Sequence, residues 1–120
     1  MSFAASDAVG FVLHSAINGL SVRQQVIADN IANVDTPGFR ARSVEFESAL
    51  SRAIEGGSAS AEDLGVAVSP TQTPVGANDN NVDLRKESIA AIQTQYQYQI
   101  MGRAISDRNA RLGTLAGGGA

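Results

Sequence analysis

The chain has no cysteine and no tryptophan, and aromatic residues make up only 5% of its 120 residues. Without cysteine there are no disulfides and no thiolate ligands for a metal. The formal net charge of −3 has the wrong sign for contacts with nucleic-acid phosphates, which need clustered Lys and Arg. No stretch approaches the roughly 20 apolar residues that cross a bilayer. We therefore expect neither nucleic acid as a partner nor membrane insertion.

Groups suited to catalysis are scarce as well. The single histidine, His14, lies in a helical pattern, with no nucleophile or carboxylate cluster nearby to take part in acid–base chemistry. No glycine-rich phosphate loop and no metal-ligand spacing is present. We expect a protein that is not an enzyme and has no catalytic residue, no cofactor and no metal. His14 then lies on a helix surface or packs.

Two long stretches have the periodicity of amphipathic helices. In the first, Gly10 to Val34, an apolar seam is interrupted only by Gln24; its members are Leu13, Ile17, Leu20, Gln24, Ile27, Ile31 and Val34. Gly10 and Gly19 weaken this helix but permit the close approach of another. In the second stretch, Val82 to Leu112, residues recur at sevens, with apolar residues on adjacent rows: Leu84, Ala91, Tyr98, Ile105 and Leu112, beside Ile89, Ile92, Tyr96, Ile100 and Met101. Asp83 is the expected N-cap of the second helix, with Asn81 as the alternative.

Within the second stretch, the segment QTQYQYQI (93–100) alternates with period two, as a strand would. We predict a helix, because glutamine is a good helix former and no turn residue bounds the segment. The two tyrosines are expected to pack, with their hydroxyls at a polar edge. The glutamines either form a solvated face or donate hydrogen bonds to neighbouring subunits.

The middle of the chain is weaker. Phe46, Leu50 and Ile54, at four-residue spacing, predict a short helix that is capped by Ser43 and carries Glu45 and Glu47 in its first turn. Residues 56–81 are rich in Gly, Ser, Ala, Pro, Asn and Asp, with almost no large apolar side chain to offset the entropy of ordering. We interpret them as a mobile segment that orders only against partners.

These elements predict an all-α fold, in which two long terminal helices pair as an antiparallel, coiled-coil-like hairpin. A short helix and a flexible, partly extended middle segment connect them. The expected divisions are an N-terminal helix at 1–36, a turn, short helix and linker at 37–81, a C-terminal helix at 82–113 and a flexible tail at 114–120. The polar middle segment has too few apolar residues to cover the apolar seams of both long helices. Apolar surface that stays exposed usually marks an interface with another protein. We therefore expect the fold to be completed only among other chains.

The exit of the first helix, ADNIANVDTPGFRAR (28–42), is unusually rich in polar and turn-forming residues. Thr36 precedes Pro37 and is pushed towards extended geometry, and Pro37-Gly38 suits the central pair of a type II turn. Asn30 and Asn33 lie three residues apart, where their amides can satisfy open carbonyls at the helix end or reach a neighbouring chain. Phe39 then anchors the returning chain.

This stretch closely resembles the N-terminal signature of the bacterial flagellar rod and hook proteins, Asn-Ile-Ala-Asn-x-x-Thr-Pro-Gly-Tyr/Phe. Every position of that signature is matched here: Asn30, Ile31, Ala32, Asn33, Thr36, Pro37, Gly38 and Phe39. The segment NNVDLRKE (80–87), which includes Asn81, Val82 and Asp83, is similar to the element Gly-Asn-x-Val-Asp-x-x-x-Glu that opens the C-terminal helix of proximal rod proteins. The usual glycine is replaced around Asp79. The segment TQYQYQ resembles the Gln-x-x-Tyr-Gln segment of the same helix.

The resemblance implies a structural subunit of the proximal rod of the flagellar basal body, which assembles helically around the export channel and transmits torque. The partners that it implies are other copies of the chain, other rod proteins, the adaptor between the rod base and the MS ring, and the flagellar type III export gate. It also implies a place in the periplasmic rod after export without a cleaved signal, and no Lys or Arg precedes the apolar part of the N-terminus. Subunit packing is expected from the two seams, at Leu13, Ile17, Leu20, Ile27, Ile31, Leu84, Ile92, Tyr96, Tyr98 and Ile105.

Rod-type and hook-type export substrates are thought to carry a Phe-x-x-x-apolar element that the export gate recognises. Phe46 and Leu50 match this spacing, although ordinary helix packing would also explain it. Two other functions fit the sequence less well. One is that of the neighbouring rod protein FlgC, whose members usually carry an insertion before the turn that ANVDTPGF lacks. The other is a cytoplasmic coiled-coil adaptor or export chaperone.

Overall fold

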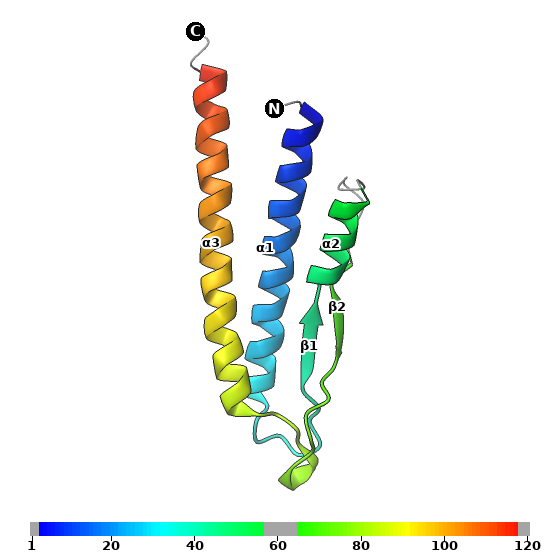
Figure 1. Cartoon of the computed structure of the whole chain (residues 1–120). Coiled ribbons are helices and arrows are strands. Elements are labelled where there is room, and N and C mark those ends of the chain that lie inside the picture. Colours follow the sequence, from blue (N-terminus) through cyan, green and yellow to red (C-terminus); the bar gives the residue numbers. More distant parts are fainter. Residues whose placement is uncertain (1–2, 57–64, 118–120) are drawn as a thin grey trace.

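The computed structural model of the protein describes residues 3–56 and 65–117 (Figure 1). Its elements in chain order are α1 (Phe3–Ala32), β1 (Arg42–Glu45), α2 (Glu47–Glu55), β2 (Ala67–Pro70), the 3₁₀ turn η1 (Ala77–Asp79) and α3 (Leu84–Gly117). The two long helices run antiparallel and pack against each other, as predicted. On the other side of α1 lie the strands and α2, so that α1 is the middle layer (Figure 1).

The molecule is long and thin. Its dimensions are 65 × 27 × 15 Å, and its Cα radius of gyration is 18.2 Å. A compact chain of this length would have a radius of gyration of about 14 Å. Most side chains therefore have one neighbouring layer at most, and only a narrow core can form along α1.

The bounds of the long helices differ from those that the periodicity indicated. α1 begins earlier, at Phe3, and ends at Ala32, two residues before Val34. α3 begins at Leu84 and continues to Gly117, past the predicted end at 113. The Lys86 N–H donates to Asp83 Oδ1 at 3.2 Å, which confirms Asp83 as the N-cap of α3. Residues 93–100 are helical, as predicted against the strand interpretation. Of the predicted tail, residues 118–120 lie outside the described part of the chain.

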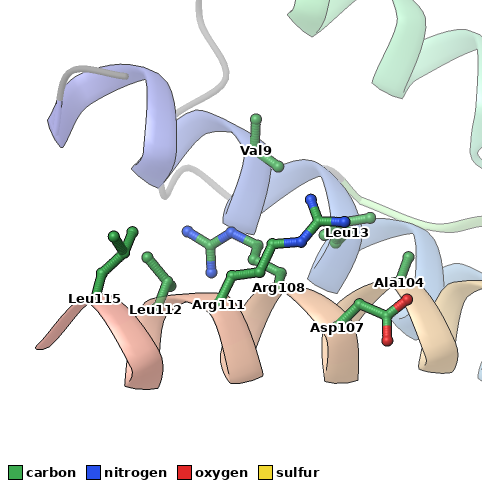
Figure 2. Close-up of a pocket in the computed structure, with 8 residues that line it drawn as sticks. All are labelled: Val9, Leu13, Ala104, Asp107, Arg108, Arg111, Leu112 and Leu115. Atoms are coloured by element: carbon green, nitrogen blue, oxygen red, sulfur yellow. The ribbon is translucent and has the colours of Figure 1, made fainter. Parts of the chain in front are cut away.

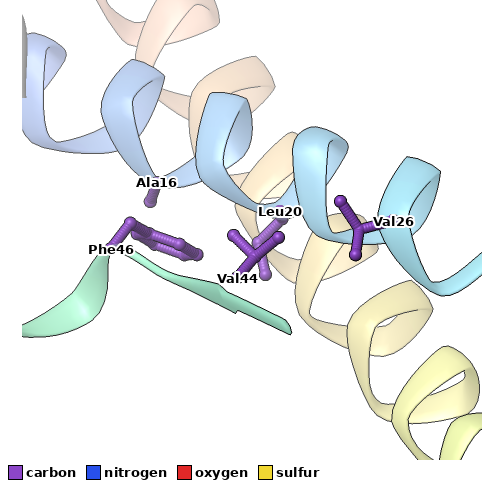
Figure 3. Close-up of a cluster of buried hydrophobic side chains, with 5 residues drawn as sticks. All are labelled: Ala16, Leu20, Val26, Val44 and Phe46. Atoms are coloured by element: carbon purple, nitrogen blue, oxygen red, sulfur yellow. The ribbon is translucent and has the colours of Figure 1, made fainter. Parts of the chain in front are cut away.

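The core joins α1 to the strand that follows it. Its buried members come from α1 and from the segment around β1: Ala16, Leu20, Val26, Val44 and Phe46 (Figure 3). Met101 of α3 packs against this cluster from the other side, and Leu50 of α2 from the same side as Phe46. α1 is thus buried against both neighbouring layers, which is why its seam holds the three layers together.

Gly19 makes the contact between α1 and Phe46 possible. A Cβ built at Gly19 would overlap the Phe46 ring, so the ring lies directly on the helix backbone. The prediction that Gly19 permits a close approach is correct, although the element that approaches is the residue before α2 and not a second long helix. At Gly10 the neighbour does come from α3, because a Cβ there would lie 3.1 Å from Arg108 Nη2.

The N-terminus of α2 is built differently from the prediction. Ser43 lies in β1, and the residue at the cap position is Phe46, whose side chain makes no capping hydrogen bond. Glu45 takes this role, because its Oε1 accepts the Ser48 N–H at 3.0 Å. The predicted cap at Ser43 is therefore wrong: the chain is still extended there, and the helix starts later than the apolar spacing suggested.

Part of the middle segment is extended and forms β2, which pairs with β1. β1 and β2 run antiparallel, with Arg42 opposite Pro70 and Glu45 opposite Ala67. The sequence predicted a partly extended segment here, but not this sheet. Residues 57–64, which belong to the stretch interpreted as mobile, lie outside the described residues.

Arg23 ties the core to α2. Its Nη2 donates to the Val44 carbonyl oxygen at 2.8 Å and pairs with the Glu47 carboxylate, and its guanidinium lies 4.9 Å from the centroid of the Phe46 ring. Partial burial acts to raise the pKa of Glu47. The hydrogen bond and charge of Arg23, with the backbone N–H groups of Phe46 and Glu47, outweigh burial and lower that pKa below its ordinary 4.5.

We predict that Gly19→Ala lowers the free energy of unfolding by about 1 to 3 kcal/mol, because the added methyl group overpacks the contact with Phe46. The matched control is Gly102→Ala in α3, where the space beside the backbone is open. There the same substitution should raise stability by roughly 0.5 to 1 kcal/mol through helix propensity. Urea unfolding followed by circular dichroism measures both. Equal effects of the two substitutions would mean that the Phe46 contact imposes no constraint.

The Glu47 ion pair predicts a pH dependence. Because the pKa of Glu47 is lower in the folded than in the unfolded chain, the pair stabilises the fold above pH 4.5. This stabilisation is lost as the pH falls through the folded-state pKa. Glu47→Gln should flatten the decline of stability between neutral and acidic pH, whereas Glu55→Gln, at an exposed position of the same helix, should not. An unchanged slope in Glu47→Gln would contradict the prediction.

Candidate functional site

The turn after α1 has the predicted geometry. Gly38 has a φ of +76°, as the second central residue of a type II turn requires, and the Phe39 N–H donates to the Thr36 carbonyl oxygen at 3.2 Å. Nothing crowds Gly38, so its role is conformational. The turn sends the chain back along α1 into β1.

Asn30 fastens the returning chain to the helix. It is fully buried; its Nδ2 donates to the Arg42 carbonyl oxygen at 2.8 Å, and its Oδ1 accepts the Arg42 N–H at 3.1 Å. The side-chain amide thus satisfies both backbone groups of one residue, as a neighbouring strand would. Two roles were predicted for Asn30: to satisfy an open carbonyl at the helix end, or to reach a neighbouring chain. Its amide does neither here and instead binds the backbone of Arg42 within the same chain.

Asn33 closes the end of the helix. Its Nδ2 donates to the Asp29 carbonyl oxygen at 2.8 Å, and its Oδ1 accepts the Thr36 hydroxyl at 3.0 Å. The Asp29 carbonyl oxygen also accepts the Asn33 N–H at 3.2 Å, so the amide adds a second hydrogen bond at the helix end and does not satisfy an open carbonyl. Asn33 also orients Thr36 at the start of the turn.

Two further asparagines attach the start of α3 to the same place. Asn80 Nδ2 donates to the carbonyl oxygens of Asn33 at 2.9 Å and Thr36 at 2.8 Å. Asn81 Oδ1 accepts the Ala41 N–H at 2.6 Å, and both Asn80 and Asn81 are buried. Asn30, Asn33, Asn80 and Asn81 together form what we call the asparagine clasp, which joins the end of α1, the turn and the entry to α3.

The site residues predicted from the sequence include Asn30, Asn33 and Asn81 and omit Asn80. The signal for Asn80 was nevertheless present, because it stands at the asparagine of the Gly-Asn-x-Val-Asp element. The replacement of a glycine around Asp79 predicts an altered turn just before Asn80. Asn78 and Asp79 both have positive φ, 61° and 59°, so the chain takes a conformation that favours glycine without having one. An ion pair between Arg40 and Asp79, 2.7 Å long, accompanies this turn.

The clasp leaves little for chemistry, because its amides are bonded to the chain itself. Among the described residues, no three His, Asp or Glu side chains gather where they could hold a metal ion. No helix in the described part of the chain has an apolar stretch long enough to cross a membrane. His14 is exposed on α1, which agrees with the predicted position on a helix surface and not with packing.

The large apolar side chains of α3 lie mostly outside the fold. Its buried positions are polar, namely Glu87 and Thr94, and the Thr94 hydroxyl donates to the Ala90 carbonyl oxygen at 2.7 Å. By contrast, the exposed fraction is 52% for Ile89, 59% for Ile92, 65% for Tyr96 and 60% for Ile100. The helix therefore pairs with α1 mainly through small and polar residues, together with Met101, which packs against the core, and the half-buried Ile105. Most of its other large apolar side chains point outwards.

The residues expected to pack between subunits divide into two groups. Leu20 and Ile27 are buried within the chain, and Leu13, Ile17, Ile31 and Ile105 are half-buried in it. Leu84, Ile92, Tyr96 and Tyr98 are exposed. Within the second group, Ile92 and Tyr96 leave more than half of their surface open to another protein.

At the free ends of the long helices, α1 and α3 leave a groove of about 540 Å³ between them (Figure 2). Its apolar lining comes from both helices and consists of Val9, Leu13, Ala104, Leu112 and Leu115. Three charged residues of α3 border it, namely Asp107, Arg108 and Arg111. The clasp closes one end of the molecule, and the groove leaves the other end open.

The geometry defines a structural protein, in which polar groups hold the chain together and apolar surface is left outside. The profile of the flagella basal body rod protein family matches residues 12–40, which include the helix end and the turn. FlgB of Borreliella burgdorferi is 32% identical over 110 residues, covering 73% of this chain and 80% of that protein. FlgB of Bacillus subtilis is 30% identical over 118 residues, covering 89% and 92%. FlgB of Escherichia coli K12 is 31% identical over 110 residues, covering 76% and 80%.

The chain belongs to the FlgB family of flagellar basal body rod proteins. It is a structural subunit of the proximal rod, in agreement with the resemblance found in its sequence. These relatives favour neither FlgC nor a cytoplasmic adaptor. Membership of a structural family is also consistent with the expectation of a protein that is not an enzyme.

We predict that Asn30→Ala lowers the free energy of unfolding by about 2 to 6 kcal/mol, because it leaves the N–H and C=O of Arg42 without partners, at roughly 1 to 3 kcal/mol each. The matched control is Asn18→Ala, at an exposed position of the same helix, which should stay within about 0.5 kcal/mol of the parent. Urea unfolding measures both. Parity of the two variants would show that the clasp contributes nothing.

Proposed function

We propose that this chain assembles helically with other copies and other rod proteins around the export channel, and transmits torque through many weak lateral contacts. The single observation that carries this proposal is the exposed apolar face of α3. A face of this size is costly to leave in water, and its burial against neighbours would favour assembly. Exposed ion pairs contribute only about 0 to 1 kcal/mol each, so the apolar residues would dominate.

The clasp fits this role because it fixes the angle between the two long helices. Torque passes through a subunit only if its elements do not slide past one another. The four asparagines join the α1 exit, the turn and the α3 entry through side-chain to backbone hydrogen bonds, with donor–acceptor distances of 2.6 to 3.1 Å. The side-chain amides of three exposed glutamines of α3 would then form hydrogen bonds with neighbouring subunits. These residues are Gln95, Gln97 and Gln99.

We further propose that the chain is exported unfolded through the flagellar type III export gate, without a cleaved signal, and attaches at the rod base through the adaptor to the MS ring. The element recognised at the gate is Phe46 with Leu50. In the fold Phe46 is buried and Leu50 is half-buried, both against the core. Recognition would therefore precede folding, and the same two side chains would serve export first and packing afterwards.

Both parts are tested in a strain that lacks its own proximal rod protein. The parent chain should restore motility and be found in purified basal bodies. Phe46→Ala should accumulate in the cytoplasm, because the gate no longer recognises it, and this is measured by immunoblotting of cytoplasmic and exported fractions.

The matched control is Val44→Ala, which also shortens a buried core side chain but leaves the Phe46–Leu50 pair intact. It should be exported. Normal export of Phe46→Ala would remove the gate proposal, and absence of the parent chain from basal bodies would remove the assembly proposal.

A further inference from the structure

Two apolar surfaces of the molecule have no partner within the described part of the chain. The first is the outer stripe, which consists of Ile89, Ile92, Tyr96 and Ile100, each more than half exposed. Tyr96 lies two residues from the buried Thr94, and two residues correspond to about 200° around a helix. The outer stripe therefore points away from α1. It cannot be covered by any movement of the two helices towards each other.

The second surface is the end groove, lined by Val9, Leu13, Ala104, Leu112 and Leu115 (Figure 2). It lies at the opposite end of the hairpin from the clasp, where α1 and α3 lie apart (Figure 1). Because both helices line it, the end groove can receive the side chains of a third helix. The stripe is convex and the groove concave, so their shapes are complementary in kind.

Their lengths match as well. The outer stripe runs from Ile89 to Ile100, and the α3 wall of the end groove runs from Ala104 to Leu115. Each covers about 17 Å of helix at 1.5 Å per residue. A stripe of this length fills the groove without leaving an apolar overhang.

The charges permit the contact. Residues 88–100 contain no charged side chain, whereas Asp107, Arg108 and Arg111 border the end groove. An uncharged helix meets no like charge there. The glutamines beside the stripe, Gln95 and Gln99, offer both donors and acceptors to the Asp107 carboxylate and the Arg111 guanidinium.

We propose that the outer stripe of one copy docks into the end groove of a second copy of this chain. Such a contact is heterologous, because the two surfaces differ, and it leaves a free stripe or a free groove at each end. A heterologous contact closes into a ring only if its rotation closes, and a displacement along the axis at each step prevents this, so repetition builds an open array. In a parallel arrangement, stripe and groove lie 15 residues apart on α3, so that successive copies would be displaced along the helix axis by about 22 Å.

The contact is small, because the outer stripe has four residues and the end groove has five apolar lining residues. A stable complex buries about 20 to 30 residues on each side. A single contact would thus be weak in dilute solution, whereas many such contacts in one array would hold the copies together. This inference rests on the proposed function and names the surfaces through which assembly occurs.

Disulfide trapping tests the proposal cleanly, because the natural chain has no cysteine. Tyr96→Cys marks the middle of the outer stripe, and Leu112→Cys marks the end groove. Purified full-length variants are mixed at high concentration, oxidised mildly and analysed on non-reducing gels. We expect the mixture to form at least five times more crosslinked dimer than either variant alone. Ile92→Cys with Leu13→Cys provides a second pair.

The matched control is Ala110→Cys, which is exposed and lies two residues from Leu112. It should not crosslink with Tyr96→Cys above the level of the single variants. Strong crosslinking of Tyr96→Cys with itself would overturn the proposal in favour of a symmetric contact between stripes. Absence of crosslinking in both pairs would overturn it too. Either result would leave rod assembly intact if the parent chain still enters basal bodies and restores motility.

Discussion

The structure depends on satisfying the backbone where three segments meet. The end of α1, the type II turn and the entry to α3 all bring unpaired N–H and C=O groups to one place, and an unpaired buried group costs about 1 to 3 kcal/mol. Buried asparagine amides supply the missing partners, since one amide provides both a donor and an acceptor. The signature Asn-Ile-Ala-Asn of the sequence is thus a set of hydrogen-bonding requirements. Once these are met, the direction of β1 and of α3 along α1 is fixed.

From this junction the layers follow. α1 packs against β1 and Phe46 on one side and against α3 on another, so most of its apolar residues are buried within the chain, apart from those that line the end groove. α3 has only one neighbouring layer, and it meets that layer mainly through Thr94, Glu87 and small side chains, with Met101 as the large apolar contact. Small residues allow the helices to approach closely, but they bury little apolar area. Most of the larger residues of α3 therefore remain outside, which is the reverse of an ordinary surface helix.

The local parts of this architecture could be predicted from the sequence and the non-local parts could not. Both long helices, the Asp83 cap and the turn at Gly38 follow from periodicity and from the residue types at fixed offsets. The pairing of Ala67–Pro70 with β1 was missed because four residues of low apolar content have no period of their own. The cap at Ser43 was misplaced because a strand, set by its partner, occupies that position. Gly19 was recognised as a site of close approach, but only the fold reveals that Phe46 is its partner.

The two ends of the hairpin consequently have different physical characters. At the clasp, buried hydrogen bonds with strict geometry allow one arrangement, and a change of a single amide is felt by several segments. At the groove, apolar contact is tolerant in direction and contributes in proportion to area. A subunit that must be specific in its own shape and adaptable towards its neighbours needs both. The sequence places them at opposite ends of α3: asparagines and the Asp83 cap where the helix begins, and leucines with arginines where it ends. Polar groups thus determine the shape of the subunit, and the apolar surface that they leave uncovered is what remains for contacts with other chains.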